Sequence, residues 1–156
     1  MLEASEKRHG LLYSTASYTD FILRGEFKIQ SGDSGLYFRA KILQTKIGIA
    51  GTQAEIDLSE QVGGLYETGG RKWFAEPKPE LVRQFVKNQD WNQILITAIG
   101  GSITVSINGR TFVSVPRDEG RREGVFALQL HGGQDMDVSF RKFELLDLAQ
   151  TGGKDY

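Results

Sequence analysis

The sequence predicts an all-β sandwich of two antiparallel sheets with at most one short helix. Apolar and polar residues alternate along several short runs, which is the pattern of half-buried strands. Turn-forming residues separate these runs at regular spacing, and 19 of the 156 residues are glycine. Asn108-Gly109 is the pair that a tight type I′ hairpin favours, because both central positions of that turn need a positive φ. On the order of ten or eleven short strands linked in this way are typical of a β-sandwich.

The first half of the chain contains five predicted strands, at residues 11–13, 20–29, 36–43, 51–58 and 63–67. In the third strand we expect Leu36, Phe38 and Ala40 to face the core and Tyr37, Arg39 and Lys41 to face outward, because residues two apart share a face. In the fourth strand, Gln53, Glu55 and Asp57 share the polar face.

The second half repeats the pattern after one interruption. Residues 71–79 are predicted to be a loop that carries Trp73 and Phe74, and residues 80–87 a short helix after Pro79. Predicted strands follow at residues 91–99, 103–107, 110–115, 125–131 and 138–148, with a charged loop at 116–123. Trp91 is expected in the core. We expect residues 1–156 to form one domain, with a core from about residue 11 to residue 148.

Composition excludes several classes of function. Lysine plus arginine number 19 and aspartate plus glutamate 20, a net charge of −1, so we expect neither a nucleic-acid partner nor a membrane partner. The absence of cysteine excludes disulfides, thiolate metal sites and a cysteine nucleophile. No apolar run approaches the roughly 20 residues of a membrane span. A soluble protein is expected, either cytoplasmic or periplasmic or secreted after removal of a signal peptide, which is not visible here.

Gln129 and His131, which lie two apart on the predicted strand at 125–131, are the best single indication of a site. Arg39, Gln53, Glu55 and Asp57 are expected on the same polar face of one sheet. A polar face on a large twisted sheet suits a carbohydrate.

Four segments, in order, resemble one family. They are DFILRGEFKI with GDSGLYFRA, GTQAEID with GGLYETGGR, DWNQILITAIGGSITVSINGRTFV, and GVFALQLHGGQDMDVSFRKFELLDL. The set resembles the 3-keto-disaccharide hydrolase family over residues 11–148. The resemblance implies a concanavalin-like jelly roll (LamG-like), a carbohydrate ligand and cleavage of sugars oxidised at position 3. The strand that usually opens the family is not found here, and the strand edge left unpaired leads us to expect a homo-oligomer.

The chemistry expected of such a site needs a base. A 3-keto group makes the proton on C2 acidic, so a base removes it and the C1 substituent leaves. His131 is the first candidate, as base or metal ligand, because imidazole titrates near neutral pH; the alternative is a hydrogen-bonded histidine at a sheet edge. Glu55 is the second, as base or metal ligand, against a solvated strand carboxylate. Asp57 could join both in holding one divalent metal ion, or simply end the strand.

Seven residues are predicted to bind substrate: Arg39, Gln53, Tyr66, Glu67, Arg71, Trp73 and Gln129. The two amides suit sugar hydroxyls, because an amide both donates and accepts. Arg39 would polarise the keto oxygen, or else form a salt bridge to Glu26 or Glu55. Trp73 would stack on a sugar ring, or else cover the edge of the core.

Three functions are weighed. The first is an enzyme that cleaves 3-keto-glycosides by elimination and hydration, which the pairing of His131 with Glu55 favours. The second is a non-catalytic carbohydrate-binding module, which needs only the amides and aromatics. The third is an ordinary glycosidase that uses two carboxylates; the run Glu55-x-Asp57-x-x-Glu60 has a suitable spacing, but Glu60 follows the predicted end of the strand.

Overall fold

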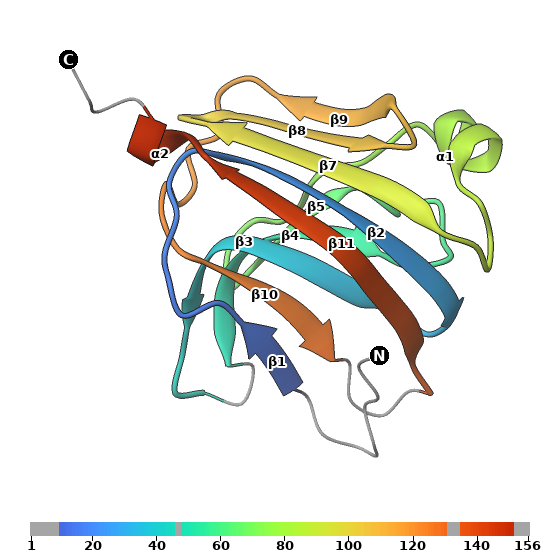
Figure 1. The fold of residues 1–156 in the computed structure, drawn as a ribbon, viewed down its shortest axis with the longest axis horizontal. Helices are drawn as coiled ribbons and strands as arrows, with labels where there is room; N and C mark the ends of the chain where they lie inside the picture. Colours follow the sequence, from blue (N-terminus) through green and yellow to red (C-terminus); the bar gives the residue numbers. More distant parts are fainter. Residues whose placement is uncertain (1–9, 46–47, 131–134, 152–156) are drawn as a thin grey trace.

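Two antiparallel sheets pack face to face in the computed structural model, which describes residues 10–45, 48–130 and 135–151 (Figure 1). The six-stranded sheet has the order β1 (Gly10–Tyr13), β10 (Val125–Leu130), β3 (Ser34–Ile42), β4 (Ile49–Ile56), β5 (Leu65–Thr68) and β6 (Lys72–Ala75). The five-stranded sheet has the order β11 (Asp137–Asp147), β2 (Phe21–Ser31), β7 (Asn92–Ile99), β8 (Ser102–Ile107) and β9 (Arg110–Val115). The predicted all-β sandwich is confirmed.

The helical content is close to the prediction. Helix α1 (Pro79–Phe85) begins at the expected proline, and the short α2 (Leu148–Thr151) follows the last strand. No helix in the described ranges is long and apolar enough to cross a membrane. The predicted loop at 71–79 is wrong in its first half, because β6 lies there and pairs with β5. A four-residue edge strand is too short to leave a recognisable alternation in the sequence.

The core lies between the sheets and follows the predicted alternation. Phe21, Leu23, Phe27 and Ile29 of β2 are buried on one face, while Arg24 and Gln30 are exposed. Each such buried side chain contributes about 1.5–3 kcal/mol, so this alternation fixes which face of β2 points inward. Core residues from other strands are Leu36, Phe38, Ala54, Ile56, Leu65, Ile94, Ile96, Val105 and Ile107.

Strand β3 departs from its predicted alternation at Arg39. The register against β4 shifts between Phe38 and Lys41, and Arg39 has a φ of 50°. Such a β-bulge sends the bulged side chain to the opposite face. Ala40 therefore packs with Tyr37 on the outer surface of the sheet, and Arg39 points inward. The outward orientation predicted for Arg39 is wrong.

The bulge depends on a close approach of β4. Gly51 has a φ of 140°, and a Cβ on it would lie 2.8 Å from the Ala40 Cα atom. Only glycine fits there without moving the backbone.

Trp91 is also misplaced by the sequence interpretation. Glu26 pairs with Gln93 and Phe27 with Asn92, so Trp91 comes opposite Lys28, on the outer face of its sheet. Its ring is half-buried between the Lys28 amine, 5.1 Å away, and the Arg141 guanidinium, 3.8 Å away. The expectation that Trp91 belongs to the core is wrong, because long cationic side chains cover the ring instead.

Candidate functional site

Strand pairing brings the two predicted amides together on the outer face of the six-stranded sheet. Gly35 pairs with Glu55, and Leu128 pairs with Leu36, so Gln129 comes next to Gly35 on the other side. A Cβ on Gly35 would overlap Gln53 Oε1 and lie 3.3 Å from Gln129 Oε1. The two amides therefore converge over a glycine whose missing side chain makes room for both.

The Gln53 side-chain oxygen is available to accept a hydrogen bond from a ligand. It is only 6% exposed, and within the described part of the chain its Oε1 atom is buried without a hydrogen-bond partner. A buried acceptor that stays unpaired costs about 1–3 kcal/mol. A ligand hydroxyl that donated to this oxygen would remove that cost.

Glu55 lies two residues further along β4 and is 8% exposed. Its pKa is raised from 4.5 to about 8, first by burial and then by the negative charges of Asp57 and Asp33. Asp57 is itself held in place, since its Oδ1 atom accepts from the Ser59 backbone N–H at 2.9 Å and from the Ser59 hydroxyl at 2.8 Å. Glu55 is thus a neutral acid at neutral pH and can exchange a proton close to that pH.

Two aromatic residues extend the row past Gln53. Gln53 pairs with Tyr66, and Tyr66 pairs with Trp73. The two rings meet edge to face, with centroids 5.2 Å apart. Both are half-buried, so they leave apolar surface beside the amides, which is the surface that a sugar ring stacks on.

Tyr37 and Asp33 were missed by the sequence interpretation. Tyr37 is buried beside Gln53, and its hydroxyl lies 2.7 Å from the Thr68 hydroxyl. Burial raises the pKa of Tyr37. Asp33 influences Glu55 only because β3 and β4 pair. No local spacing signals either relationship.

Arg39 lies away from this row. Its side chain is 2% exposed, and its guanidinium donates to the Thr19 and Gly100 carbonyl oxygens at 2.9 and 2.7 Å. The carboxylate it faces is Asp20, at 3.3 Å, and neither Glu26 nor Glu55 as weighed from the sequence. With these protein partners, the guanidinium is not presented to a ligand on the outer face.

Glu67 and Arg71 lie on the inner side of the β5–β6 hairpin. Leu65 is in the core and Glu67 is two residues on, so the two share a face, opposite Tyr66. Arg71 donates to Glu67 and forms an ion pair with Asp118 at 2.7 Å. Direct contact of Glu67 and Arg71 with substrate stays a prediction that this orientation does not favour.

His131 lies outside the described residues, so its role as base or metal ligand stays a prediction. Within residues 10–45, 48–130 and 135–151, no three histidine, aspartate or glutamate side chains are arranged to hold a metal ion. The described residues thus do not by themselves form the predicted metal site.

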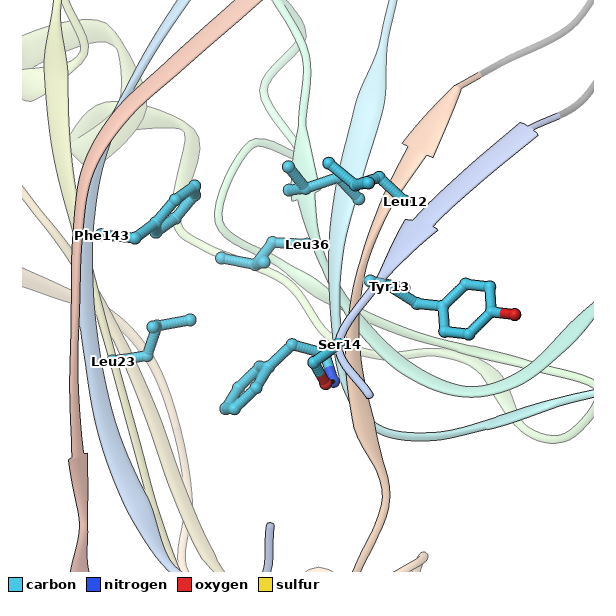
Figure 2. Close-up of a pocket in the computed structure, with 9 residues that line it drawn as sticks. Leu12, Tyr13, Ser14, Leu23, Leu36 and Phe143 are labelled. Atoms are coloured by element: carbon cyan, nitrogen blue, oxygen red, sulfur yellow. Dashed lines mark hydrogen bonds between the residues drawn. The ribbon is translucent and has the colours of Figure 1, made fainter. Parts of the chain in front are cut away.

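An apolar cavity of about 290 Å³ lies elsewhere, between the two sheets (Figure 2). Phe143 and Leu23 line it from one sheet, and Leu12 and Leu36 from the other. None of the predicted site residues that the structure describes lines it. Its lining is almost entirely apolar, and the Ser14 hydroxyl there is already bonded to the Ala16 carbonyl oxygen and the Phe126 backbone N–H. Because a sugar site needs polar groups that fix the orientation of the ligand, this cavity is not the candidate site.

Comparisons with known proteins agree with the fold. The carbohydrate-binding module CBM66 from Bacillus subtilis is 20% identical, with a TM-score of 0.69 over 91% of this chain and 83% of that one. A "putative glycosyl hydrolase" from Parabacteroides distasonis is 18% identical, with a TM-score of 0.67 over 92% of this chain and 85% of that one. Chicken galectin 2 is 12% identical, with a TM-score of 0.55 over 87% of this chain and 97% of that one. At these identities the structural likeness shows the fold alone.

No curated protein matches this sequence. A family model described as the 3-keto-alpha-glucoside-1,2-lyase-like domain matches residues 1–146, nearly the whole chain. The resemblance seen in the four sequence segments is therefore confirmed, and the chain belongs to the 3-keto-alpha-glucoside-1,2-lyase-like domain family.

Proposed function

We propose that this protein cleaves 3-keto-glycosides, and that Glu55 and the two amides on the outer face of the six-stranded sheet form its site. The observation that carries the proposal is the juxtaposition of a buried carboxyl group on Glu55 with a buried amide oxygen on Gln53 that has no hydrogen-bond partner among the described residues. Membership of the lyase-like family supports the reaction class. The carbohydrate-binding module among the structures of similar fold supports a sugar ligand.

The reaction begins with removal of the C2 proton of the sugar. The carboxylate form of Glu55 takes this proton, and the electron pair moves into an enolate that includes the C3 oxygen. The enolate then expels the oxygen substituent on C1, which takes the proton from Glu55 and leaves as an alcohol. A double bond remains between C1 and C2, and Glu55 is a carboxylate again. Water then adds its hydroxyl group to C1 and its proton to C2, so the net reaction is hydrolysis.

The pKa of Glu55 suits this role. With a pKa of about 8, about one tenth of the molecules carry the carboxylate at pH 7, and that carboxylate is a much stronger base than an exposed one. His131 remains the other predicted base, to be tested by substitution in parallel.

The neighbouring side chains would hold the sugar. Gln53 Oε1 would accept from a hydroxyl, and the amide N–H groups of Gln53 and Gln129 would donate to sugar oxygens, the C3 oxygen among them. Trp73 and Tyr66 would stack on the apolar face of the ring. The predicted divalent metal ion also stays a proposal, and no step above depends on it.

The test is a turnover assay with a 3-keto-glucoside and its unoxidised parent, with and without chelator. Wild type should cleave only the keto sugar. Glu55→Gln, which keeps the shape of the side chain but cannot take a proton, should lose about 100-fold or more in kcat. Glu144→Gln is the matched control, because Glu144 is exposed and pairs with Arg24 on the other sheet. A wild type that cleaves neither sugar would overturn the proposal.

A non-catalytic carbohydrate-binding function is the second candidate. It is favoured by the structural likeness to CBM66 and needs only the amides and the aromatic pair. Sugar binding by wild type and Glu55→Gln alike, without turnover of the keto sugar by either, would establish it.

An ordinary carboxylate-pair glycosidase is not supported. Glu60 is exposed beyond the end of β4 and forms an ion pair with Arg83 at 2.6 Å.

A further inference from the structure

The β5–β6 hairpin carries the aromatic pair of the proposed site at the margin of its sheet. Both strands have only four residues, and β6 is the last strand of the six-stranded sheet. Backbone pairing on one side fixes such an edge only weakly. The orientation of the Tyr66 and Trp73 side chains must therefore depend on contacts that hold the hairpin on its inner face, towards the core.

Arg71 provides that hold on the inner side. Its Nε atom donates to Glu67 Oε2 at 2.7 Å, which closes the turn of the hairpin, and its guanidinium lies over the Phe74 ring with 4.0 Å to the centroid. Its Nη1 atom lies 2.7 Å from Asp118 Oδ1. The fork of the guanidinium thus ties the hairpin to a residue in another part of the chain.

Asp118 belongs to the loop that leads from β9 of one sheet to β10 of the other. Its side chain is 1% exposed. Its backbone N–H donates to the Gly101 carbonyl oxygen at 2.7 Å, in the turn between β7 and β8. Arg122 in turn donates to the Asp118 carbonyl oxygen at 2.9 Å. The backbone of Asp118 is therefore fixed to the five-stranded sheet independently of the contact that its side chain makes with Arg71.

The loop is shaped around this contact. A Cβ on Gly120 would lie 2.9 Å from Arg71 Nη2 and 3.0 Å from Asp118 Oδ2. Glycine leaves the space in which the guanidinium and the carboxylate meet. A side chain there would push the two groups apart.

We propose that Asp118 is a positioning residue: through Arg71 it ties the β5–β6 hairpin to the five-stranded sheet and so fixes Trp73 and Tyr66 beside Gln53. The inference rests on the proposed function for its effect on sugar binding. Asp118 touches no substrate, because it lies on the inner side of the hairpin while Trp73 lies on the outer side. Its loss should weaken binding of the sugar ring more than it slows proton transfer at Glu55.

The test uses Asp118→Asn, which keeps the size of the side chain and removes its charge. KM for the 3-keto-glucoside should rise about tenfold while kcat changes less than about twofold, since the base is untouched. Glu144→Gln, which removes an exposed ion pair, should change neither. If the KM of Asp118→Asn equals that of wild type, the proposal is wrong.

A second readout does not depend on the reaction. The chain has two tryptophans, so a Trp91→Phe background leaves Trp73 as the sole indole emitter. In that background, Asp118→Asn should shift Trp73 emission to longer wavelength and speed amide exchange across residues 65–75. Unchanged emission and exchange would refute the positioning role, even if wild type fails to cleave any sugar and the proposed function falls.

A second variant covers the case in which Asp118→Asn does not fold. Gly120→Ala displaces the guanidinium from the carboxylate without burying a new polar group, and it should shift the same emission in the same direction. Wild-type emission from a folded Gly120→Ala would count against the proposal.

Discussion

The protonation of Glu55 predicts an unusual dependence of stability on pH. Its pKa is about 8 in the folded protein, against an ordinary value of 4.5. Between these values the folded state holds a proton that the unfolded state has released. Stability therefore falls as pH rises from about 4.5 towards 8, which is the opposite of a salt-bridged carboxylate. Below the ordinary pKa both states are protonated, and above about 8 both are ionised.

The magnitude follows from the same pKa values. Each pKa unit corresponds to about 1.4 kcal/mol, so the rise from 4.5 to about 8 allows a loss of at most roughly 5 kcal/mol across that range. A loss of that size is comparable with the whole stability of many domains, about 5–15 kcal/mol. Glu55→Gln removes the titrating group and keeps its size. The variant should thus gain stability relative to wild type as pH rises.

The assay is urea unfolding of wild type and Glu55→Gln at several pH values from about 5 to 8.5, extrapolated linearly to water. The difference between the two unfolding free energies should grow by several kcal/mol from the acid end to the alkaline end. Glu144→Gln, which changes an exposed carboxylate on the other sheet, is measured in parallel as the control substitution. A difference between Glu55→Gln and wild type that stays constant with pH would refute the conclusion that Glu55 is neutral in the folded protein.

Four further predictions concern the reaction, the packing and the assembly of the chain. With Glu55 as the base, kcat/KM for the keto sugar should rise with pH to a plateau above about 8; a flat profile would exclude this role. Gly35→Ala should lower the free energy of unfolding, measured in urea, by about 1–3 kcal/mol, because the new Cβ overlaps Gln53 Oε1. The same variant should show no sugar binding when binding is measured by calorimetry. Arg39→Ala should lower the free energy of unfolding by about 3–5 kcal/mol, because it leaves the Thr19 and Gly100 carbonyl oxygens without their donor. A variant as stable as wild type would contradict the structural role of Arg39. The predicted homo-oligomer is checked by light scattering, where a monomer would dispose of it.

Local patterns in the sequence determined much of the fold. Alternation in β2 correctly indicated which residues face the core, because successive side chains of a strand point in opposite directions. In β4 it correctly placed Ala54 and Ile56 in the core, but the strand ends there and Leu58 is exposed. Asn108-Gly109 correctly indicated its hairpin, and the two residues have φ values of 52° and 80°. The four ordered segments correctly indicated the family. The sequence alone also predicts that Gln53 and Glu55 share a face, since they are two residues apart on one strand.

The pairing of strands far apart in the sequence decided the rest. Arg39 faces inward because β3 has a bulge where it pairs with β4. The residues of β3 contain no pattern that would predict this bulge. The sequence predicts that Arg71 binds substrate, but its guanidinium meets Asp118, which lies in a loop from the other side of the sandwich. The pKa of Glu55 depends on burial and on Asp33 across the sheet. Periodicity is a property of one strand, whereas bulges, ion pairs and desolvation depend on which strands meet, and only the tertiary structure determines that.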